Sequence, residues 1–253
     1  WLDDFVQRIP VSTDVVRYTY QTAGTDGTNY QAGQLALKGE SNLVFAEKSV
    51  NVETIATYVI CSRQILSDAP RLTNVIDTTL TKRVGKKLSL EALYGDGGTN
   101  HFQGIITNPD VAEVAPTAGG NRIDYVRKLI TAVELAGGAA NGILLSPQAW
   151  EAIELAKDEN KAYHSLVLNN ALGKSMFGVR VRTTANLLEN DFVVGDWDLA
   201  VKFYERETIN IETSTSHADL FIKNGVAVLA ETRGAIAVED PTVLVKGDFS
   251  LVV

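Results

Sequence analysis

The chain has 253 residues, 45% of them hydrophobic, which fits one large domain or two small ones. No run reaches the ~18 consecutive apolar residues of a membrane-spanning helix, so we expect a soluble protein with no membrane partner. The formal net charge of −8 argues against a protein that binds nucleic acid by neutralising phosphates, because that function needs clustered Lys and Arg.

The cysteine content and the start of the chain add two expectations. The single cysteine, Cys61, excludes an internal disulfide, and its apolar neighbours predict a buried structural thiol. The sequence begins at Trp1 without the basic flank and apolar run of a signal peptide. Either preceding residues were removed by processing, or the sequence begins late within the protein.

Two strand patterns enclose a long polar segment near the N-terminus. Residues 15–20 alternate between apolar and polar side chains, and residues 50–60 are rich in Val, Ile, Thr and Tyr. Residues 21–47 between them carry four glycines among Thr, Gln, Asn and Ser. Such a long loop is unusual in a compact domain unless it binds something or is disordered. Because strands flank it, we predict a projecting β-hairpin; the alternative is a flexible loop.

A long helix is predicted after this hairpin. Ser67 or Asp68 can cap its first turn, and Pro70 suits an early helical position. Apolar residues recur every four positions, with Val75 beside them, and form one stripe: Leu72, Ile76, Leu80, Val84, Leu88 and Ala92. A single stripe implies one buried side and leaves the other side for solvent or partners.

Two glycines mark this helix. Gly95 is expected to end it in the left-handed conformation after about 25 residues, a length of roughly 37 Å. Gly85 lies inside the helix and costs about 1 kcal/mol relative to Ala, which close packing or a bend would explain.

The basic cluster of the chain lies on the same helix. Lys82, Arg83, Lys86 and Lys87 form two adjacent i,i+4 ridges. Two interpretations remain open: a solvated helix face, or a face turned toward a polyanion or an acidic partner.

From residue 121 onward, helix and strand patterns alternate. Asn121 is expected to cap a helix that ends at Gly137, and Ser146 begins another helix with apolar Trp150 and Leu155. The inward positions of the first helix are Ile123, Val126, Ile130 and Val133. Strands are predicted at 142–145, 179–183, 192–195 and 226–238, with two more at 200–213 around residues 205–207 and an extended segment at 242–253.

Three segments invite a ligand-binding interpretation without completing a motif. The glycines at 95–98 follow a helix, whereas phosphate loops precede one. Residues 173–175 read Gly-Lys-Ser but lack the earlier glycine of a Walker loop. Asp191, Asp196 and Asp198 could bind a divalent cation, but their spacing is not that of a calcium loop, so we expect a solvated turn.

The remaining titratable residues also lack a functional spacing. No pair among His101, His164 and His217 has metal-ligand spacing. Four carboxylates could act as acid and base, but no motif supports that role for Glu205, Glu207, Glu231 and Glu239. We therefore predict no catalytic residue, no cofactor and no metal ligand, and we favour a structural role.

Seven segments form an ordered set of motifs. They are IATYVICSRQILSDA at 55–69, LEALYGDGG at 90–98, GII at 104–106, LLSPQAWEAIELAKD at 144–158, MFGVRVRTT at 176–184, FVVGDW at 192–197 and GVAVLAETRGAIAVEDP at 225–241. In this order, over nearly the whole chain, they resemble the major capsid proteins of tailed bacteriophages, which have the HK97-like capsid fold. The resemblance implies an α+β subunit with a long spine helix, a projecting extended loop, and peripheral and axial domains.

The resemblance also implies a division of the chain. The expected parts are the end of an N-terminal arm at 1–14, the extended loop with its flanking strands at 15–60, the peripheral domain with the spine helix at 61–120, the axial domain at 121–235, and a return to the peripheral domain at 236–253.

Candidate contact residues follow from these parts. We expect Phe5, Lys38 and Glu40 to contact neighbouring subunits, and the basic face formed by Lys82, Arg83, Lys86 and Lys87 to point toward the interior. Some family members cross-link a loop lysine to a distant asparagine. Lys38 lies in the corresponding loop, but no motif matches the asparagine, so no cross-link is predicted.

The resemblance implies a structural subunit of an icosahedral capsid. It would assemble into hexamers and pentamers around double-stranded DNA, which it contacts weakly and without sequence preference. Expected further partners are portal, scaffold, protease and decoration proteins. The expected location is the virion, after assembly in the cytoplasm of the bacterial host.

Two alternatives remain open at this point. An encapsulin-like nanocompartment shell would share the fold and package enzymes. An α/β enzyme that uses residues 121–240 would instead be a monomer or small oligomer with convergent titratable groups in a pocket.

Overall fold

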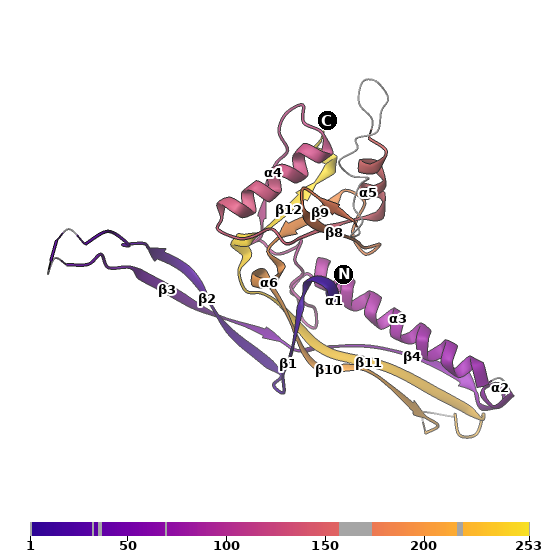
Figure 1. Cartoon of the computed structure of the whole chain (residues 1–253). Coiled ribbons are helices and arrows are strands. Elements are labelled where there is room, and N and C mark those ends of the chain that lie inside the picture. Colours follow the sequence, from indigo (N-terminus) through magenta and orange to yellow (C-terminus); the bar gives the residue numbers. More distant parts are fainter. Residues whose placement is uncertain are drawn as a thin grey trace.

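The computed structural model describes residues 2–31, 33–34, 37–68, 70–156, 174–216 and 220–252. Figure 1 shows an elongated half, a compact half and a hairpin that projects away from both. Helices pack on sheets whose strands come from distant parts of the chain, so the predicted α+β class is confirmed. Within these described ranges, no helix is long and apolar enough to cross a membrane.

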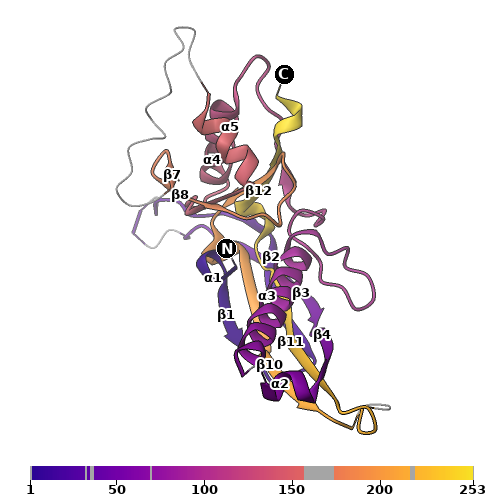
Figure 2. The ribbon, with the colours of Figure 1, turned by 90° about the vertical axis from the view of Figure 1, so that its right-hand side faces the viewer.

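A narrow four-stranded sheet forms the elongated half. Its strand order is β1 (Gln7–Pro10), β10 (Val201–Ser214), β11 (Gly225–Val238) and β4 (Glu53–Ser62). β11 pairs antiparallel with both β10 and β4, and β1 runs parallel to the start of β10. Figure 2 shows these long strands beside the helix α3.

β10 corrects one sequence expectation. We predicted two strands around residues 205–207, but β10 is a single strand whose register shifts between Glu205 and Glu207 and again between Glu207 and Asn210. A bulge tolerates consecutive charged residues without ending the strand, which is why the pattern resembled a turn.

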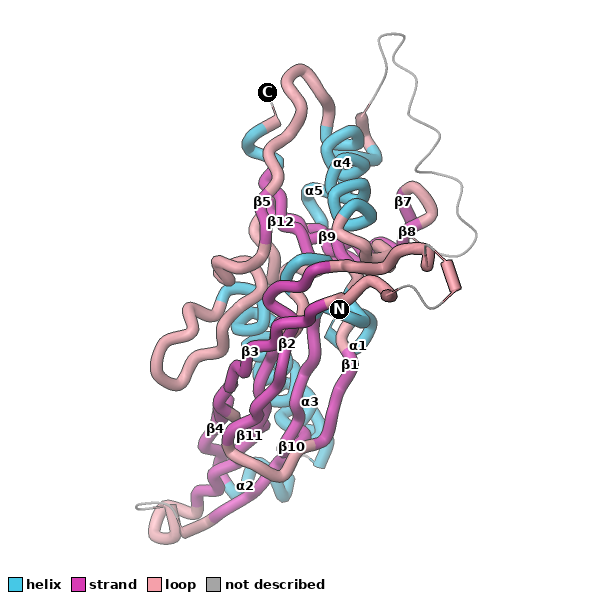
Figure 3. The backbone as a smooth tube through the Cα atoms, turned by 90° about the vertical axis from the view of Figure 1, so that its left-hand side faces the viewer, coloured by secondary structure: helices cyan, strands magenta, loops and turns pink. Residues whose placement is uncertain are grey.

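The predicted hairpin is present as β2 (Val15–Thr25) and β3 (Asn42–Asn51), which form their own two-stranded sheet. In Figure 3 it points toward the viewer. The strand expected at 50–60 is divided, because β3 ends at Asn51 and β4 begins at Glu53 in the other sheet. The chain therefore changes sheets at Val52.

Only the root of the hairpin is packed on the body. Val16 and Val52 lie in a small core with Tyr204 and two alanines of β11. Lys48 Nζ lies 2.5 Å from Asp110 Oδ2 and anchors β3 to the body. Every described residue from 21 to 45 except Gly27 is exposed, so the distal hairpin has no packing partner in its own subunit.

The predicted long helix is α3 (Pro70–Tyr94), which has 25 residues and follows the short helix α2 (Arg63–Asp68). Its stripe packs on β4, β10 and β11, with Leu80, Val84 and Leu88 at most 3% exposed. Val75 is instead 57% exposed, because at 100° per residue it lies opposite the buried stripe. The side chains of Ser67 and Asp68, predicted as caps, lie outside the described part of the chain.

Gly95 ends the helix for a different reason from the one expected. Its φ is not positive; the left-handed glycine of this turn is Gly97, with φ +68°. A Cβ at Gly95 would lie 2.2 Å from the backbone oxygen of Phe102 and 2.7 Å from that of Glu91. The turn needs a glycine here because two backbone segments approach closely.

Gly85 has no such constraint, since a Cβ there would meet nothing within 4 Å. Close packing within the subunit therefore does not explain this glycine. We expect Gly85→Ala to raise the free energy of unfolding by about 0.5–1 kcal/mol, because alanine lowers the entropy cost of helix formation. Urea unfolding of the two proteins measures this difference, and a destabilised variant would contradict the prediction.

A six-stranded sheet forms the core of the compact half. Its strand order is β5 (Ala112–Glu113), β12 (Leu244–Asp248), β9 (Asp191–Gly195), β6 (Gly142–Leu145), β8 (Val179–Thr183) and β7 (Ser175–Met176). The helices α4 (Arg122–Leu135) and α5 (Pro147–Glu154) share one core with one face of this sheet. The other face packs with the C-terminal end of α3 and with Trp197, which joins the two halves.

The predicted helix ends of the compact half are confirmed. Asn121 and Asp124 form a reciprocal capping box at the start of α4, and Gly137 adopts φ +89° after its end. Ser146 accepts a hydrogen bond from the Ala149 amide and caps α5. Leu155, expected on the apolar face, is 55% exposed because it follows the last turn of α5.

The two halves of the structure do not coincide with the predicted segments 121–235 and 236–253. β10 and β11 lie in the elongated sheet beside β4, although most of both was assigned to the axial domain. β12 was expected to return to the domain of the long helix, but it pairs with β9 in the compact sheet. The expected extended segment at 242–253 is β12 flanked by two short 3-10 helices, Pro241–Val243 and Phe249–Leu251.

Candidate functional site

The distal hairpin exposes an apolar surface that its own subunit leaves uncovered. Leu43, Val44 and Phe45 are 56%, 44% and 60% exposed, and Tyr30 and Leu37 near the tip are each 98% exposed. Figure 1 shows this tip far from the rest of the molecule. A group of exposed apolar residues on a projecting element is typical of a contact surface for another molecule.

Lys38 and Glu40 lie on the returning chain of this hairpin tip. Both are exposed, and neither forms an ion pair with a residue that the structure describes. Gly27 and Gly39 allow the two chains to approach here, because a Cβ at Gly27 would lie 2.0 Å from the backbone oxygen of Glu40. Both charges are therefore available to another molecule.

Phe5 does not belong to this surface. It lies in α1 (Leu2–Phe5), is 6% exposed, and stacks on Trp197 with ring centroids 5.2 Å apart. Its ring is buried in the core that joins the two halves, so Phe5 has a packing role within its own subunit, and its contact with a neighbouring subunit stays a prediction.

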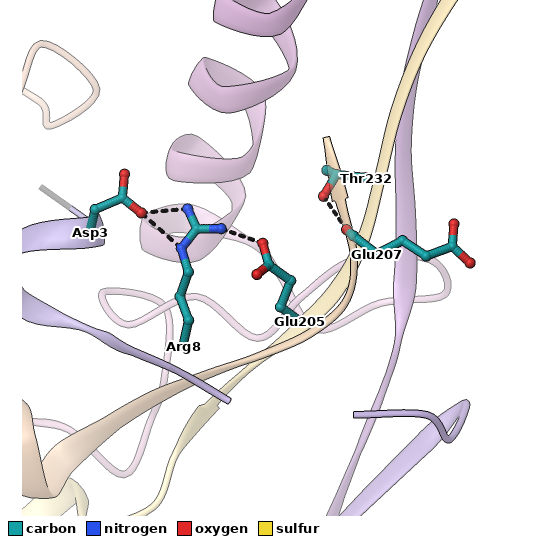
Figure 4. A network of polar contacts seen from close by, with 5 residues as sticks. All are labelled: Asp3, Arg8, Glu205, Glu207 and Thr232. Atoms are coloured by element: carbon teal, nitrogen blue, oxygen red, sulfur yellow. Dashed lines mark hydrogen bonds and ion pairs between the residues drawn. The ribbon is translucent and has the colours of Figure 1, made fainter. Parts of the chain in front are cut away.

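Polar contacts fix the N-terminal segment to β10 (Figure 4). Arg8 lies between Asp3, which accepts from its Nε at 2.8 Å, and the carboxylate of Glu205. The hydroxyl of Thr232 donates to the backbone oxygen of Glu207 at 2.9 Å, across the bulge. The Glu207 carboxylate lies 3.5 Å from Arg233 Nη1, so both glutamates considered above as a possible acid and base have cationic partners in the structure.

The basic cluster on α3 is exposed but not uniform. Lys82, Arg83 and Lys86 form no ion pair with any described residue, whereas Lys87 Nζ lies 2.6 Å from Glu91 Oε1. The free positive charge is thus concentrated on three residues, which lie on the side of α3 that faces away from the sheet.

Glu91 is the most buried carboxylate of this helix. Burial acts to raise its pKa, but hydrogen bonds and the charges of Lys87 and His101 outweigh burial and lower the pKa below its ordinary value of 4.5. His101 Nδ1 lies 3.1 Å from Glu91 Oε2 and connects the helix to the following turn. The ionised carboxylate therefore stabilises the end of α3.

This shift predicts a pH dependence. A carboxyl group with a lowered pKa in the folded state stabilises above its unfolded pKa, and the stabilisation disappears as the pH falls through the folded pKa. We expect the unfolding free energy of the wild type to fall below pH 4.5, and Glu91→Gln to reduce that dependence. Urea unfolding across this range measures it. Glu47→Gln is the control, since its 3.8 Å pair with Arg17 is exposed; equal pH profiles for wild type and Glu91→Gln would contradict the prediction.

The three aspartates near β9 form structural contacts and are not simply a solvated turn. Asp196 is 6% exposed and accepts from the Asn141 side chain at 3.0 Å, and Asp198 accepts from the same amide group. Asp191 accepts from the hydroxyl of Tyr94 at 2.6 Å. Among the described residues, no group of three His, Cys, Asp or Glu side chains could hold a metal ion.

The remaining candidate side chains are dispersed. A hollow of about 300 Å³ lies between the hairpin root and the turn after α3, and its titratable residues are Glu53 and His101. His101 is already paired with Glu91, while His164 and His217 lie outside the described residues. Cys61 is half-buried, not fully buried as expected. Among the described residues, no hydrogen bond or ion pair joins Glu53 to His101.

The sequence analysis did not predict a further pair of exposed apolar residues. Phe221 and Ile222 are 81% and 83% exposed in the turn between β10 and β11, at the far end of the elongated sheet. The available signal was an apolar run, Leu220 to Ile222, immediately before a turn. Apolar runs usually indicate buried strands, so their exposure could be recognised only from the fold.

Comparison with solved structures identifies this architecture. The capsid of an empty GTA particle matches with a TM-score of 0.78 at 16% identity, covering 98% of this chain and 89% of that one. A virus-like particle from Pyrococcus furiosus matches with a TM-score of 0.67 at 12% identity, covering 98% and 92%. The narrow sheet with its long helix, the compact half and the projecting hairpin together define the HK97-like capsid fold.

Sequence comparison then gives the family. Residues 1–249 match the model of the phage capsid family. The major capsid protein of Enterobacteria phage HK97 is 31% identical over 248 residues, which are 98% of this chain. This chain spans 64% of the length of that relative. The chain belongs to the phage capsid family, a family of structural proteins, and the predicted resemblance is confirmed.

Proposed function

We propose that this chain is the shell subunit of an icosahedral phage capsid. It self-assembles into hexamers and pentamers that enclose double-stranded DNA, and it is located in the virion after assembly in the host cytoplasm. The main support is the distal hairpin, because its large apolar residues are between 44% and 98% exposed in the subunit. A contact between two different surfaces of identical subunits closes into a ring when the rotation per subunit is right, and rings can tile a shell.

The candidate residues take roles within this proposal. Lys38 and Glu40 at the hairpin tip contact a neighbouring subunit, and the basic face of α3 points toward the interior, where it makes weak contact with packaged DNA. The compact half serves as the axial domain, and the elongated half as the peripheral domain. Portal, scaffold, protease and decoration proteins are the further partners of such a shell.

Electron microscopy of the purified assembled protein tests this proposal. We expect closed icosahedral particles, and particles from phage-infected cells should contain double-stranded DNA. A protein that stays monomeric at physiological concentration and shows turnover of a substrate would overturn it and support the α/β enzyme.

The similarity to a virus-like particle from Pyrococcus furiosus supports one second candidate, a nanocompartment shell that packages enzymes. Both shells would look alike by symmetry, so the contents decide between them. Closed particles that lack nucleic acid and hold a cargo enzyme would replace the phage capsid with this alternative.

A further inference from the structure

The side of α3 that faces away from the sheet carries a regular ridge. Val75, Thr79, Lys82, Lys86 and Leu90 follow one another at intervals of three and four residues, so they lie in a line along the helix. We call these five residues the outer ridge. The stripe that packs on the sheet, centred on Val84, lies on the opposite side of the helix. The ridge is therefore not needed for the fold of the subunit.

The outer ridge and its surroundings are strongly basic. Lys82, Lys86 and the adjacent Arg83 are exposed and form no ion pair with a described residue, and Arg71 is exposed one turn before Val75. Between residues 71 and 90 the helix holds a single carboxylate, Asp77, which is half-buried on the inward side. This is a local exception in a chain of net charge −8, so the surface selects an anionic partner.

Apolar residues stand at both ends of the ridge. Val75 is 57% exposed and Leu90 is 37% exposed. They are separated by fifteen positions, or about 22 Å along the axis at about 1.5 Å per residue. Single exposed apolar residues are common, but here two of them lie in line with the free cations. A partner that contacts both the cations and the apolar ends needs two apolar groups about four helical turns apart, with carboxylates between them.

Gly85 is consistent with a close approach on this side of the helix. It lies beside Lys82 and Lys86, and a Cβ there would meet nothing within 4 Å of its own subunit. The fold of the subunit therefore does not explain why this position has a glycine, which destabilises the helix relative to alanine. A partner helix that approaches the backbone at this point would explain it, since helices pack most closely where side chains are small.

We propose that the outer ridge binds an acidic amphipathic helix. Its carboxylates pair with Lys82, Arg83 and Lys86, and its apolar residues pack on Val75 and Leu90. Duplex DNA would contact the same cations, as in the weak interior contact proposed above, but it would bind less tightly than the helix because it gains little from the apolar ends. The ridge is separate from the hairpin, so this inference stands whether or not the chain closes into shells.

Fluorescence anisotropy with the purified full chain tests this inference. The probe is a synthetic helical peptide of about 20 residues, rich in Glu, with leucines about four turns apart on one face. The comparisons are a scrambled peptide of the same composition and a DNA duplex of about 20 base pairs. We expect the amphipathic peptide to bind at least about 10-fold more tightly than the scrambled one, since only it presents both charge and apolar anchors.

Substitutions in the outer ridge separate the contribution of its charged residues to peptide binding from that of its apolar residues. Lys82→Glu with Lys86→Glu should weaken peptide binding by at least about 10-fold. Val75→Ser with Leu90→Ser should weaken binding of the peptide and leave that of DNA unchanged. Lys128→Glu, at an exposed lysine on α4 in the compact half, is the matched control and should leave peptide binding unchanged. Equal affinity for both peptides, or tighter binding of DNA that ignores Val75 and Leu90, would overturn the inference.

Discussion

Replacing residues 21–45 with a two-residue Asn-Gly turn will leave a folded subunit that cannot assemble. Tyr20 and Ala46 are paired in the hairpin register, so a short turn can join them without shifting the root. The packed residues Val16 and Val52 and the Lys48–Asp110 ion pair remain. Because nearly all removed residues are exposed, the free energy of unfolding should change by no more than about 1 kcal/mol.

The same deletion should abolish assembly, although it leaves the free energy of unfolding nearly unchanged. The deletion removes Leu43, Phe45 and the tip residue Leu37, which are between 56% and 98% exposed in the free subunit and have no other apparent structural use. Sizing chromatography and electron microscopy should show monomers where the wild type forms particles. The double substitution Leu43→Ser and Phe45→Ser keeps the hairpin length and should also lower the yield of particles. Normal particles from the deletion variant would refute the assigned role of the hairpin.

The second large effect is expected at the end of α3, where Gly95→Val should destabilise the subunit by at least about 3 kcal/mol. The new Cβ would lie 2.2 Å from the backbone oxygen of Phe102 and 2.7 Å from that of Glu91. Both are backbone atoms, so no side-chain rotation relieves the clash. The amide of Gly104 donates to the Gly95 oxygen at 2.9 Å, so a shift of this turn also disturbs Ile105 in the main core.

Urea unfolding of the hairpin-deleted protein is the suitable measurement, since assembly cannot then mask the loss. Gly85→Ala is the matched control, because it changes a glycine in the same helix where the added Cβ has free space. The two substitutions should shift stability in opposite directions. An unchanged unfolding midpoint for Gly95→Val would show that the turn can rearrange, contrary to the close approach seen in the structure.

The candidate surfaces follow from how the two sheets divide the chain. The elongated sheet buries one face under α3, and the compact sheet joins it through Trp197 and Phe5. Several of the exposed large apolar residues lie at the extremities: Tyr30 and Leu37 at the hairpin tip, and Phe221 in the turn between β10 and β11. A subunit with exposed apolar residues at its extremities can contact neighbouring copies there, which is the basis of the proposed shell function.

The sequence by itself determined many of the features that depend on neighbours in the chain. The length of α3, its buried stripe, the N-cap at Asn121 and the buried strand 142–145 were all predicted correctly, because spacing and caps act over a few residues. The family was likewise predicted from short motifs in a fixed order.

Only the tertiary structure decided which segments share a sheet. β10 pairs with β1 and β11 pairs with β4, both from the other end of the chain, and Phe5 stacks on Trp197, nearly two hundred positions away. These pairings depend on contacts that no local pattern records, which is why the sequence could not assign β10 and β11 to their sheet. Helical spacing places Val75 opposite Val84, and the structure shows that the sheet covers the Val84 side and leaves Val75 exposed.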